Sequence, residues 1–362
     1  MKPSAAMAVL VMASAVAACS SGATTATTGV TSDQACADVA QARCNLRSEC
    51  SRPDGTTDLG FNLLENYGDM TTCLAREALA CKNGLAAPQT GNSPNDVEMC
   101  VVAFASYSCM DFFDNQPPQA CTPTGPLAAG ATCTFSGQCQ SGFCNGTKDS
   151  ACGTCGPPPE TDDDCSSSTC LRGDRCLAGT STCAAVVTSN GICDETHPCD
   201  RELSCVGSNA KTMTTGTCET AGTREGVACG GTMPGCDATR GLYCAGPNGS
   251  KVCRQVGYGG TTAGPDGGIT ASDAGASGPT PAGTACGQLA DGTRVGCVAG
   301  TCTTATGVAT GSDMGTCQPL AADGQPCDTM LGPGCMSPAR CVITSGTTGT
   351  CVVPTASMCT GT

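Results

Sequence analysis

Residues 324–351, GQPCDTMLGPGCMSPARCVITSGTTGTC, carry the pattern that decides the fold of this chain. Four cysteines lie close together in this stretch, with few large apolar residues between them. A segment of this size cannot fold by burying apolar surface alone. A disulfide that closes a loop of roughly 15 residues stabilises a protein by about 3 kcal/mol in the chain-entropy model. The stretch therefore predicts a small unit held by two disulfides.

The same arrangement of four cysteines recurs six times after Gly130. Only Gly, Asn or Asp stands three residues before the first cysteine, and these residues best tolerate positive φ, so we expect a left-handed turn there. The six sets are Cys133, Cys139, Cys144 and Cys155 (unit 1); Cys165, Cys170, Cys176 and Cys183 (unit 2); Cys193, Cys199, Cys205 and Cys218 (unit 3); Cys229, Cys236, Cys244 and Cys253 (unit 4); Cys286, Cys297, Cys302 and Cys317 (unit 5); and Cys327, Cys335, Cys341 and Cys351 (unit 6).

Within a unit, the chain between the third and fourth cysteines often has the pattern of a β-hairpin. Residues 242–256, LYCAGPNGSKVCRQV, contain a Pro-Asn-Gly turn between two short runs of strand-forming residues. Four cysteines allow three pairings, and of these we favour the crossed one, first to third and second to fourth. Cys152 and Cys359 fall outside the register. Either they bridge each other and return the end of the chain to unit 1, or unit 1 or the tail is irregular.

Residues 36–121 have the pattern of an α-helical domain. Ser93, Pro94 and Asp96 form a helix start at the head of SPNDVEMCVVAFASYSCMDFF, and Gly84 is a plausible left-handed cap at the end of a second helix. Pairs of cysteines eight residues apart in two of the helices predict that these helices are joined side by side by two bridges. The region contains eight cysteines: Cys36, Cys44, Cys50, Cys73, Cys81, Cys100, Cys109 and Cys121.

The first cysteine, Cys19, has a different setting. A short apolar run after Lys2 ends in Val-Ala-Ala-Cys, which is typical of a lipoprotein signal peptide spanning 1–18 with lipidation at Cys19. The alternative is an ordinary secretory signal cut near Ala18. Of 35 cysteines, removing Cys19 leaves 34, and an even number in an exported chain indicates a disulfide framework.

The remaining segments are linkers by composition. Residues 19–35 are small and polar and predict a flexible tether, and residues 254–285 contain no cysteine until the next unit begins and predict a disordered linker. The predicted fold is thus an N-terminal α-helical disulfide-bonded domain (36–121), followed by small disulfide-rich modules in tandem. Four units lie in 130–253, and two further units and a tail lie in 286–362. The formal net charge of −14 argues against nucleic acid as a partner.

Four local motifs contain residue types that can take part in chemistry. His197 is the single histidine, and we expect it to be a solvated loop residue. A His-based catalytic triad or a His-rich metal site would need further partner residues. CGTC at 152–155 has redox spacing, but three prolines follow it and exclude the required helix. We interpret ETDDDC at 160–165 as a solvated acidic turn. We interpret the Arg-Gly-Asp at 172–174 as a chance match to the integrin-binding tripeptide. We expect no catalytic residues, no metal site and no cofactor.

The Gly-x-x-Cys units resemble the Dickkopf N-terminal cysteine-rich region and, more loosely, epidermal-growth-factor-like modules. Residues 121–160 match that pattern best, although Cys152 departs from it. The whole layout resembles a set of exported bacterial lipoproteins with a lipobox, a helical eight-cysteine domain and such units. YGDMTTCLAREALACKNGLAAPQTGNSP, residues 67–94, looks like their first domain. The resemblance implies an architecture and no activity.

Together these features predict a non-enzymatic, lipid-anchored protein of the outer membrane or cell surface. Its disulfide-held modules would serve binding or adhesion, since staples reduce the ordering cost of binding. We expect the partner to be an extracellular or envelope protein or a glycan, and the membrane to be reached only through the lipid. The alternative is a protease-resistant spacer of the envelope without a specific ligand.

Overall fold

The structure is a computed structural model that describes residues 29–147, 150–166, 168–177, 180–209, 212–247, 249–258, 279–288, 293–308, 313–355 and 357–359. The predicted signal peptide, Cys19 and the first part of the predicted tether lie outside these ranges. The last part of that tether differs from the prediction, because the first helix already begins at Ser32. The hydroxyl of Thr31 accepts a hydrogen bond from the Gln34 amide and caps this helix.

Five α-helices form the N-terminal region. They are α1 (Ser32–Cys50), α2 (Phe61–Tyr67), α3 (Met70–Leu85), α4 (Pro94–Phe104) and α5 (Cys109–Phe113), followed by the 3₁₀ turn η1 (Gln119–Cys121). Two disulfides, Cys36–Cys81 and Cys44–Cys73, join α1 to α3 side by side as predicted. Cys50–Cys109 and Cys100–Cys121 complete a set that uses all eight cysteines of the region.

The predicted start of α4 is confirmed, but two predicted helix ends are wrong. Ser93 and Asp96 form a capping box around Pro94, as expected. The helix stops at Phe104 instead of running to residue 113, because the Ser108 hydroxyl accepts from the Asp111 amide and starts α5 separately. Gly84 is not a left-handed cap, since α3 continues through it to Leu85.

The rest of the described chain forms short strands. They are β1 (Thr132–Cys133), β2 (Cys144–Thr147), β3 (Ser150–Cys155), β4 (Asp174–Cys176), β5 (Cys183–Ala185), β6 (Ile192–Cys193), β7 (Leu203–Val206), β8 (Gly216–Thr220), β9 (Leu242–Ala245), β10 (Val252–Gln255), β11 (Gly257–Tyr258), β12 (Ala285–Gln288), β13 (Arg294–Gly296), β14 (Gly300–Thr304), β15 (Gly307–Val308), β16 (Met314–Pro319), β17 (Pro326–Asp328), β18 (Arg340–Ser345) and β19 (Thr348–Val352). Two further 3₁₀ turns are η2 (Ser136–Gln138) and η3 (Ala238–Arg240).

The predicted hairpin recurs in every unit. The third and fourth cysteines face each other across an antiparallel pair of strands in all six, for example Cys205 opposite Cys218 and Cys341 opposite Cys351. The disulfides then join the first cysteine to the third and the second to the fourth, which is the crossed pairing favoured above.

The left-handed turn at the start of each unit is also confirmed. The residue three positions before the first cysteine has positive φ in all six units, including Asp162 at 73° and Asn190 at 64°. Its amide donates to the carbonyl of the fourth cysteine each time, as from Gly324 to Cys351. The turn therefore brings the start of the unit against the end of its hairpin.

In units 1, 3, 5 and 6 the fourth cysteine follows Gly-Thr, and the glycine of this Gly-Thr-Cys motif is required for steric reasons. A Cβ atom at Gly349 would lie 2.1 Å from the Val342 carbonyl oxygen on the neighbouring strand, and one at Gly153 would lie 2.3 Å from that of Asn145. The strands of the hairpin approach each other too closely for a side chain at this position.

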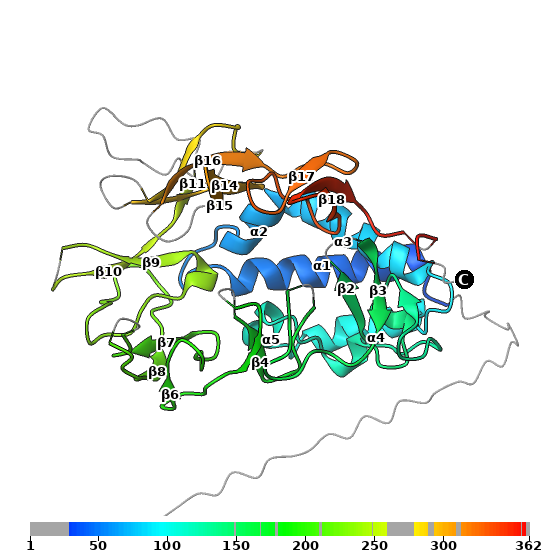
Figure 1. Ribbon diagram of the computed structural model, residues 1–362, viewed down its shortest axis with the longest axis horizontal. Helices are drawn as coiled ribbons and strands as arrows, with labels where there is room; N and C mark the ends of the chain where they lie inside the picture. The colour runs from blue at the N-terminus through cyan, green and yellow to red at the C-terminus, as the bar shows by residue number, and fades with distance from the viewer. Residues whose placement is uncertain are drawn as a thin grey trace, which may run out of the picture.

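The units surround the helices. In Figure 1 the helices lie in the middle, with units 5 and 6 above them, units 2 and 3 below and unit 4 at the left end. In five units the segment after the second cysteine makes the contact. In units 2, 3 and 4 the side chains of Arg172, Arg201 and Arg240 donate to Gln116, Asp114 and Arg52 of the helical region, in that order. In unit 5 the Ala299 amide donates to the Leu64 carbonyl. In unit 6 the Ser337 carbonyl accepts from Arg76.

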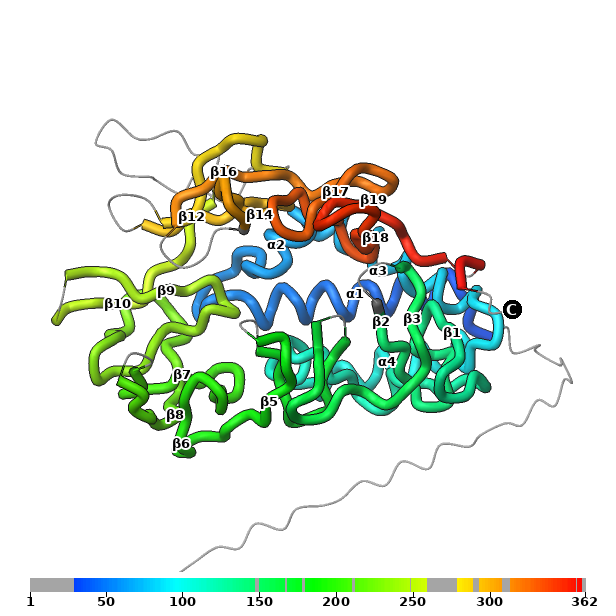
Figure 2. The backbone as a smooth tube through the Cα atoms, in the orientation of Figure 1, coloured from blue at the N-terminus to red at the C-terminus, as the bar shows by residue number. Residues whose placement is uncertain are grey.

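The chain closes on itself. Cys152 of β3 in unit 1 is bonded to Cys359 at the end of the described chain, across a sequence separation of 207 residues. Figure 2 shows the C-terminal segment beside unit 1 at the right end of the molecule. Every unit contacts the helical region in the structure. The independent folding of each unit as a tandem module therefore stays a prediction.

The ends of the predicted linker are part of this arrangement. Residues 254–258 lie in or beside β10 and β11, and β11 pairs in parallel with β13 of unit 5. Thr280 bonds Val298, and β12 begins at Ala285. The predicted linker 254–285 therefore differs from the structure at its two ends, where strand pairing fixes the chain. Residues 259–278 lie outside the described residues.

Candidate functional site

A cavity of about 690 Å³ lies where three parts of the chain meet. One wall comes from α1, α3 and α4 and from the segment around α5 and η1 of the helical region. The opposite wall comes from residues of units 1 and 2, and Arg340 of unit 6 also reaches the cavity. The volume falls in the range of about 300–1,000 Å³ that is usual for small-molecule sites.

Aromatic side chains are concentrated on this cavity. Five of the ten aromatic residues of the chain line it: Phe104, Tyr107, Phe112, Phe135 and Phe143. All five are half-buried. The rings of Phe104 and Tyr107 are 5.5 Å apart between centroids, and Tyr107 contacts the Phe112 ring edge-on at 6.2 Å. They form a continuous apolar surface that contains its own polar group, since the Tyr107 hydroxyl donates to the Asp111 carbonyl.

A buried carboxylate also lines the cavity. Glu77 of α3 is almost fully buried and accepts a hydrogen bond from the Tyr67 hydroxyl at 2.8 Å. The guanidinium groups of Arg43 and Arg47 lie 3.2 and 3.5 Å from its two oxygens. Burial opposes the charged form of Glu77, but the two arginines and the Tyr67 hydroxyl outweigh it and hold the pKa of Glu77 below its ordinary value.

Two arginines at the cavity have unused hydrogen-bond donors. The Arg43 Nε is buried and, although close to Glu77, is not aligned for a hydrogen bond. Arg340 lines the cavity from β18, and its guanidinium makes no ion pair or side-chain hydrogen bond with any of the described residues. Arg340 is exposed to solvent, and partial desolvation of its guanidinium lowers its pKa.

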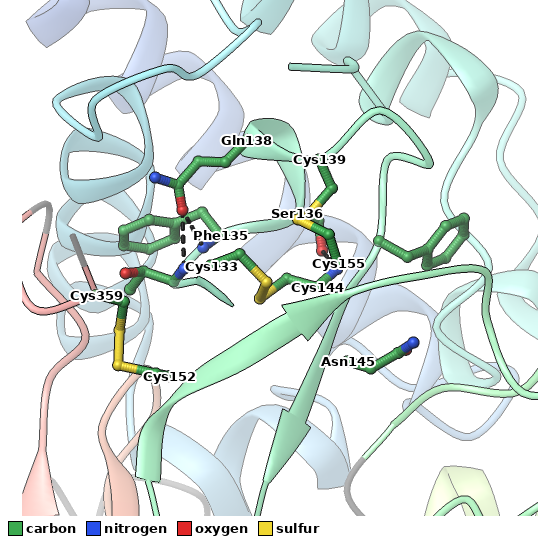
Figure 3. The surroundings of a disulfide bond; sticks show 12 residues. Cys133, Phe135, Ser136, Gln138, Cys139, Cys144, Asn145, Cys152, Cys155 and Cys359 are labelled. Carbon is green, nitrogen blue, oxygen red and sulfur yellow. Dashed lines mark hydrogen bonds between the residues drawn. A yellow bond between two sulfur atoms is a disulfide. The ribbon is translucent and has the colours of Figure 1, made fainter. Parts of the chain in front are cut away.

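Unit 1 is held in place on the opposite wall by two kinds of contact. The Gln138 side-chain oxygen accepts from the amides of Thr134 and Phe135, and its NH₂ group donates to the Pro88 carbonyl of the helical region. Figure 3 shows the two bonds that the Gln138 oxygen accepts beside the Cys152–Cys359 disulfide, with Ser136 and Asn145 on the same unit. The Asn145 amide donates to Pro157, which orders the cavity-lining strand β2.

The motifs singled out in the sequence lie elsewhere. His197 is exposed in unit 3, with its Nδ1 2.9 Å from Asp194, where hydrogen bonds from Thr196 and His197 lower the pKa of the Asp194 carboxyl. Within CGTC, Cys152 bonds to Cys359 and Cys155 to Cys139, so the two sulfurs do not form one dithiol pair.

The acidic and Arg-Gly-Asp motifs make local structural contacts. Asp163 and Asp164 accept hydrogen bonds from the amides of Glu160 and Ser166, within the turn itself. Arg172 donates to Asp111 and to the Gln116 carbonyl, so it attaches unit 2 to α5.

Cysteine sulfurs also gather in threes within 4.8 Å of one another, as at Cys133, Cys139 and Cys144. Cys133 and Cys144 are bonded to each other and Cys139 to Cys155, and sulfurs in disulfides are not the thiolates that bind metals. Crossed pairing of adjacent bridges therefore explains the grouping.

Cysteines predicted to form disulfides, such as Cys81 and Cys144, line the cavity, but none of its residues was predicted to bind a ligand. The signal available in the sequence was the concentration of aromatic residues between Phe61 and Phe113, in a chain that has few elsewhere. Phe135, Phe143 and Arg340 come from distant segments, and only the folding of the units around the helices brings them to the same cavity.

Comparisons with protein-family models, with curated proteins and with solved structures find no match to this chain. The resemblance to the Dickkopf cysteine-rich region therefore rests on the cysteine pattern alone. In the part of the chain that the structure describes, no helix is both long and apolar enough to cross a membrane.

Proposed function

We propose that the protein is a non-enzymatic, lipid-anchored binding protein of the cell envelope, and that it binds a small ligand in the cavity between the helical region and units 1 and 2. The observation that carries this proposal is the gathering of half the aromatic residues of the chain on one cavity of ligand size. The cysteines from Cys36 to Cys359 are all disulfide-bonded, which fits an exported protein.

The framework supports binding because it is fixed before a ligand arrives. The cavity walls belong to separate segments that are each closed by disulfides, and Cys152–Cys359 joins the two ends of the series of units. A site that is ordered in advance loses little conformational entropy on binding. Modules that only served as a spacer would not need aromatic side chains turned toward a shared cavity.

The binding role is tested by filling the cavity. Ala120 lines it and is exposed to it, so Ala120→Trp should obstruct the site, whereas Ala129→Trp places the same side chain on an exposed position that does not line it. A library of small aromatic compounds and sugars would be screened by ligand-detected NMR against the oxidised full-length protein. We expect compounds that bind the wild type and Ala129→Trp and lose binding to Ala120→Trp.

If no compound binds, or if both tryptophan variants bind alike, the cavity is not the ligand site. The alternative of a protease-resistant spacer would then be favoured, and it has its own support in the covalently closed ring of units.

The membrane anchor is tested separately. Labelling cells with palmitate should give a labelled protein, and Cys19→Ala should abolish the incorporation, because the lipid would be attached to this thiol. The matched control is Cys193→Ala, which removes a thiol within a unit and should keep the label. Unchanged incorporation in the Cys19→Ala variant would refute the lipoprotein.

A further inference from the structure

Resting on the proposed binding function, we infer that the ligand is a small aromatic carboxylate, with its ring against the aromatic wall and its carboxylate at the guanidinium of Arg340. Three features of the cavity lead to this class of ligand: the kind of surface, the balance of charge, and the donors that are left without partners.

The surface favours a flat ring. The Tyr107 ring lies 5.5 Å from the Phe104 ring and 6.2 Å from the Phe112 ring between centroids, and Phe135 comes from the opposite wall. Aromatic groups pair with each other in offset or edge-on geometry, which contributes about 0.5–1.5 kcal/mol beyond the area buried. An aromatic ligand could extend this series of rings.

The charge of the cavity favours an anion, although the whole protein is acidic. Two carboxylates line the cavity, and both already have partners. Glu77 is held between Arg43 and Arg47, so this group of three carries one excess positive charge. The carboxylate of Asp96 accepts from the amide and hydroxyl of Ser93, in the cap of α4.

The cation that remains is Arg340. Its guanidinium has five N–H donors, and none of them has a partner among the described residues. A planar guanidinium matches a carboxylate with two parallel hydrogen bonds, and these are among the strong ones. Arg340 is exposed to solvent and lines the cavity, so a ligand carboxylate can reach its guanidinium.

Isothermal titration calorimetry with 2-naphthoate and its neutral analogue 2-naphthamide tests this inference. The two probes share a ring system and differ in the charged group. We expect the oxidised full-length protein to bind 2-naphthoate at least tenfold more tightly than 2-naphthamide. The preference should weaken with added salt, since it is electrostatic.

Variants at Arg340 locate the charge. Arg340→Gln should remove the preference for the carboxylate, Arg340→Lys should keep part of it, and Arg224→Gln, which changes an exposed arginine outside the cavity, should leave it unchanged. An unchanged melting temperature in Arg340→Gln would show that the fold is retained, as expected for a side chain without partners.

The outcomes separate this inference from the proposed function. Equal binding of both naphthalene probes, or a preference that survives Arg340→Gln, overturns the carboxylate and leaves the cavity as a binding site. Failure of both probes while other library compounds bind in the cavity also overturns it. Failure of every compound overturns the proposed function as well.

Discussion

The helical region and the six units differ in what fills their interiors. In the helical region, Leu63 and Tyr67 pack around a disulfide, and Val39 and Val97 form a second apolar cluster. In unit 2 the buried cluster consists of three cysteines alone, and in units 1, 3 and 5 the fully buried members are again only cysteines. Disulfides therefore support an apolar core in the helical region and replace one in units 1, 2, 3 and 5.

Disulfide bonds therefore have two roles in this chain. Crosslinks between helices add to a fold that apolar burial already favours. In a unit whose interior is mostly sulfur, the disulfides supply the stabilisation that apolar burial cannot provide. The two regions should respond differently to loss of disulfides and to loss of apolar volume.

The largest effect is expected from complete reduction. In a strong reductant without denaturant, the units should lose their hairpins, whereas the helical region should keep much of its helical circular dichroism because its apolar clusters remain. Hydrogen exchange at the strand pairs, such as Cys205 opposite Cys218, measures the loss directly. Hairpin amides that stay protected after reduction would contradict the role assigned to the sulfurs.

Removal of apolar volume should have the opposite selectivity. Leu63 is fully buried, and Leu63→Ala should lower the free energy of unfolding of the helical region by about 2–5 kcal/mol. The control is Val102→Ala in α4, where the side chain is 75% exposed and the change should stay within about 0.5 kcal/mol. Chemical denaturation of the oxidised protein followed by helical circular dichroism measures both. Similar values for the two variants would remove the distinction between the regions.

The bridge that joins unit 1 to the tail should have an intermediate effect. Replacing Cys152 and Cys359 by Ala should cost about 2–4 kcal/mol, because a long loop is opened while other bridges still shorten it. The local consequence is faster hydrogen exchange at the Met358 amide, which donates to the Thr355 carbonyl in the tail. Removing Cys165–Cys176 instead should open unit 2 and leave the tail protected. Equal protection of the tail in both variants would refute closure by Cys152–Cys359.

The smallest effect concerns Glu65, where the two regions touch. Its Oε1 lies beside Gly296 of unit 5, and burial raises its pKa from 4.5 to about 7. The folded protein thus binds more protons than the unfolded chain between these values, so stability should fall as the pH rises from about 4.5 to 7.

We expect a fall of roughly 1–3 kcal/mol in the free energy of unfolding over this range, and Glu65→Gln should reduce it. Denaturation at pH 5 and pH 8 measures the difference. The exposed Glu195→Gln should retain the wild-type dependence. A wild-type slope in the Glu65→Gln variant would assign the pH dependence to other groups.

Much of the local structure was predictable because it depends on neighbouring residues. Gly, Asn or Asp before each unit indicated the positive φ at positions such as Asp162 and Asn190, and Ser93 with Asp96 indicated the start of α4. Helix ends were less predictable. Ser108 has a hydroxyl that favours a cap over a helix interior, but the stretch 93–113 also has apolar residues at helical spacing on both sides of it.

The sequence by itself determined the six units, because the spacing of four cysteines and the turn before them act within about 30 residues. It also indicated the helical region and the bridges between α1 and α3, since helix periodicity places those cysteines on one face. Only the tertiary structure decided that the units surround the helices and that Cys152 meets Cys359. It alone placed Arg340 on the same cavity as aromatic residues from the first half of the chain. Such contacts join residues far apart in sequence, and local patterns carry no information about which distant surfaces meet.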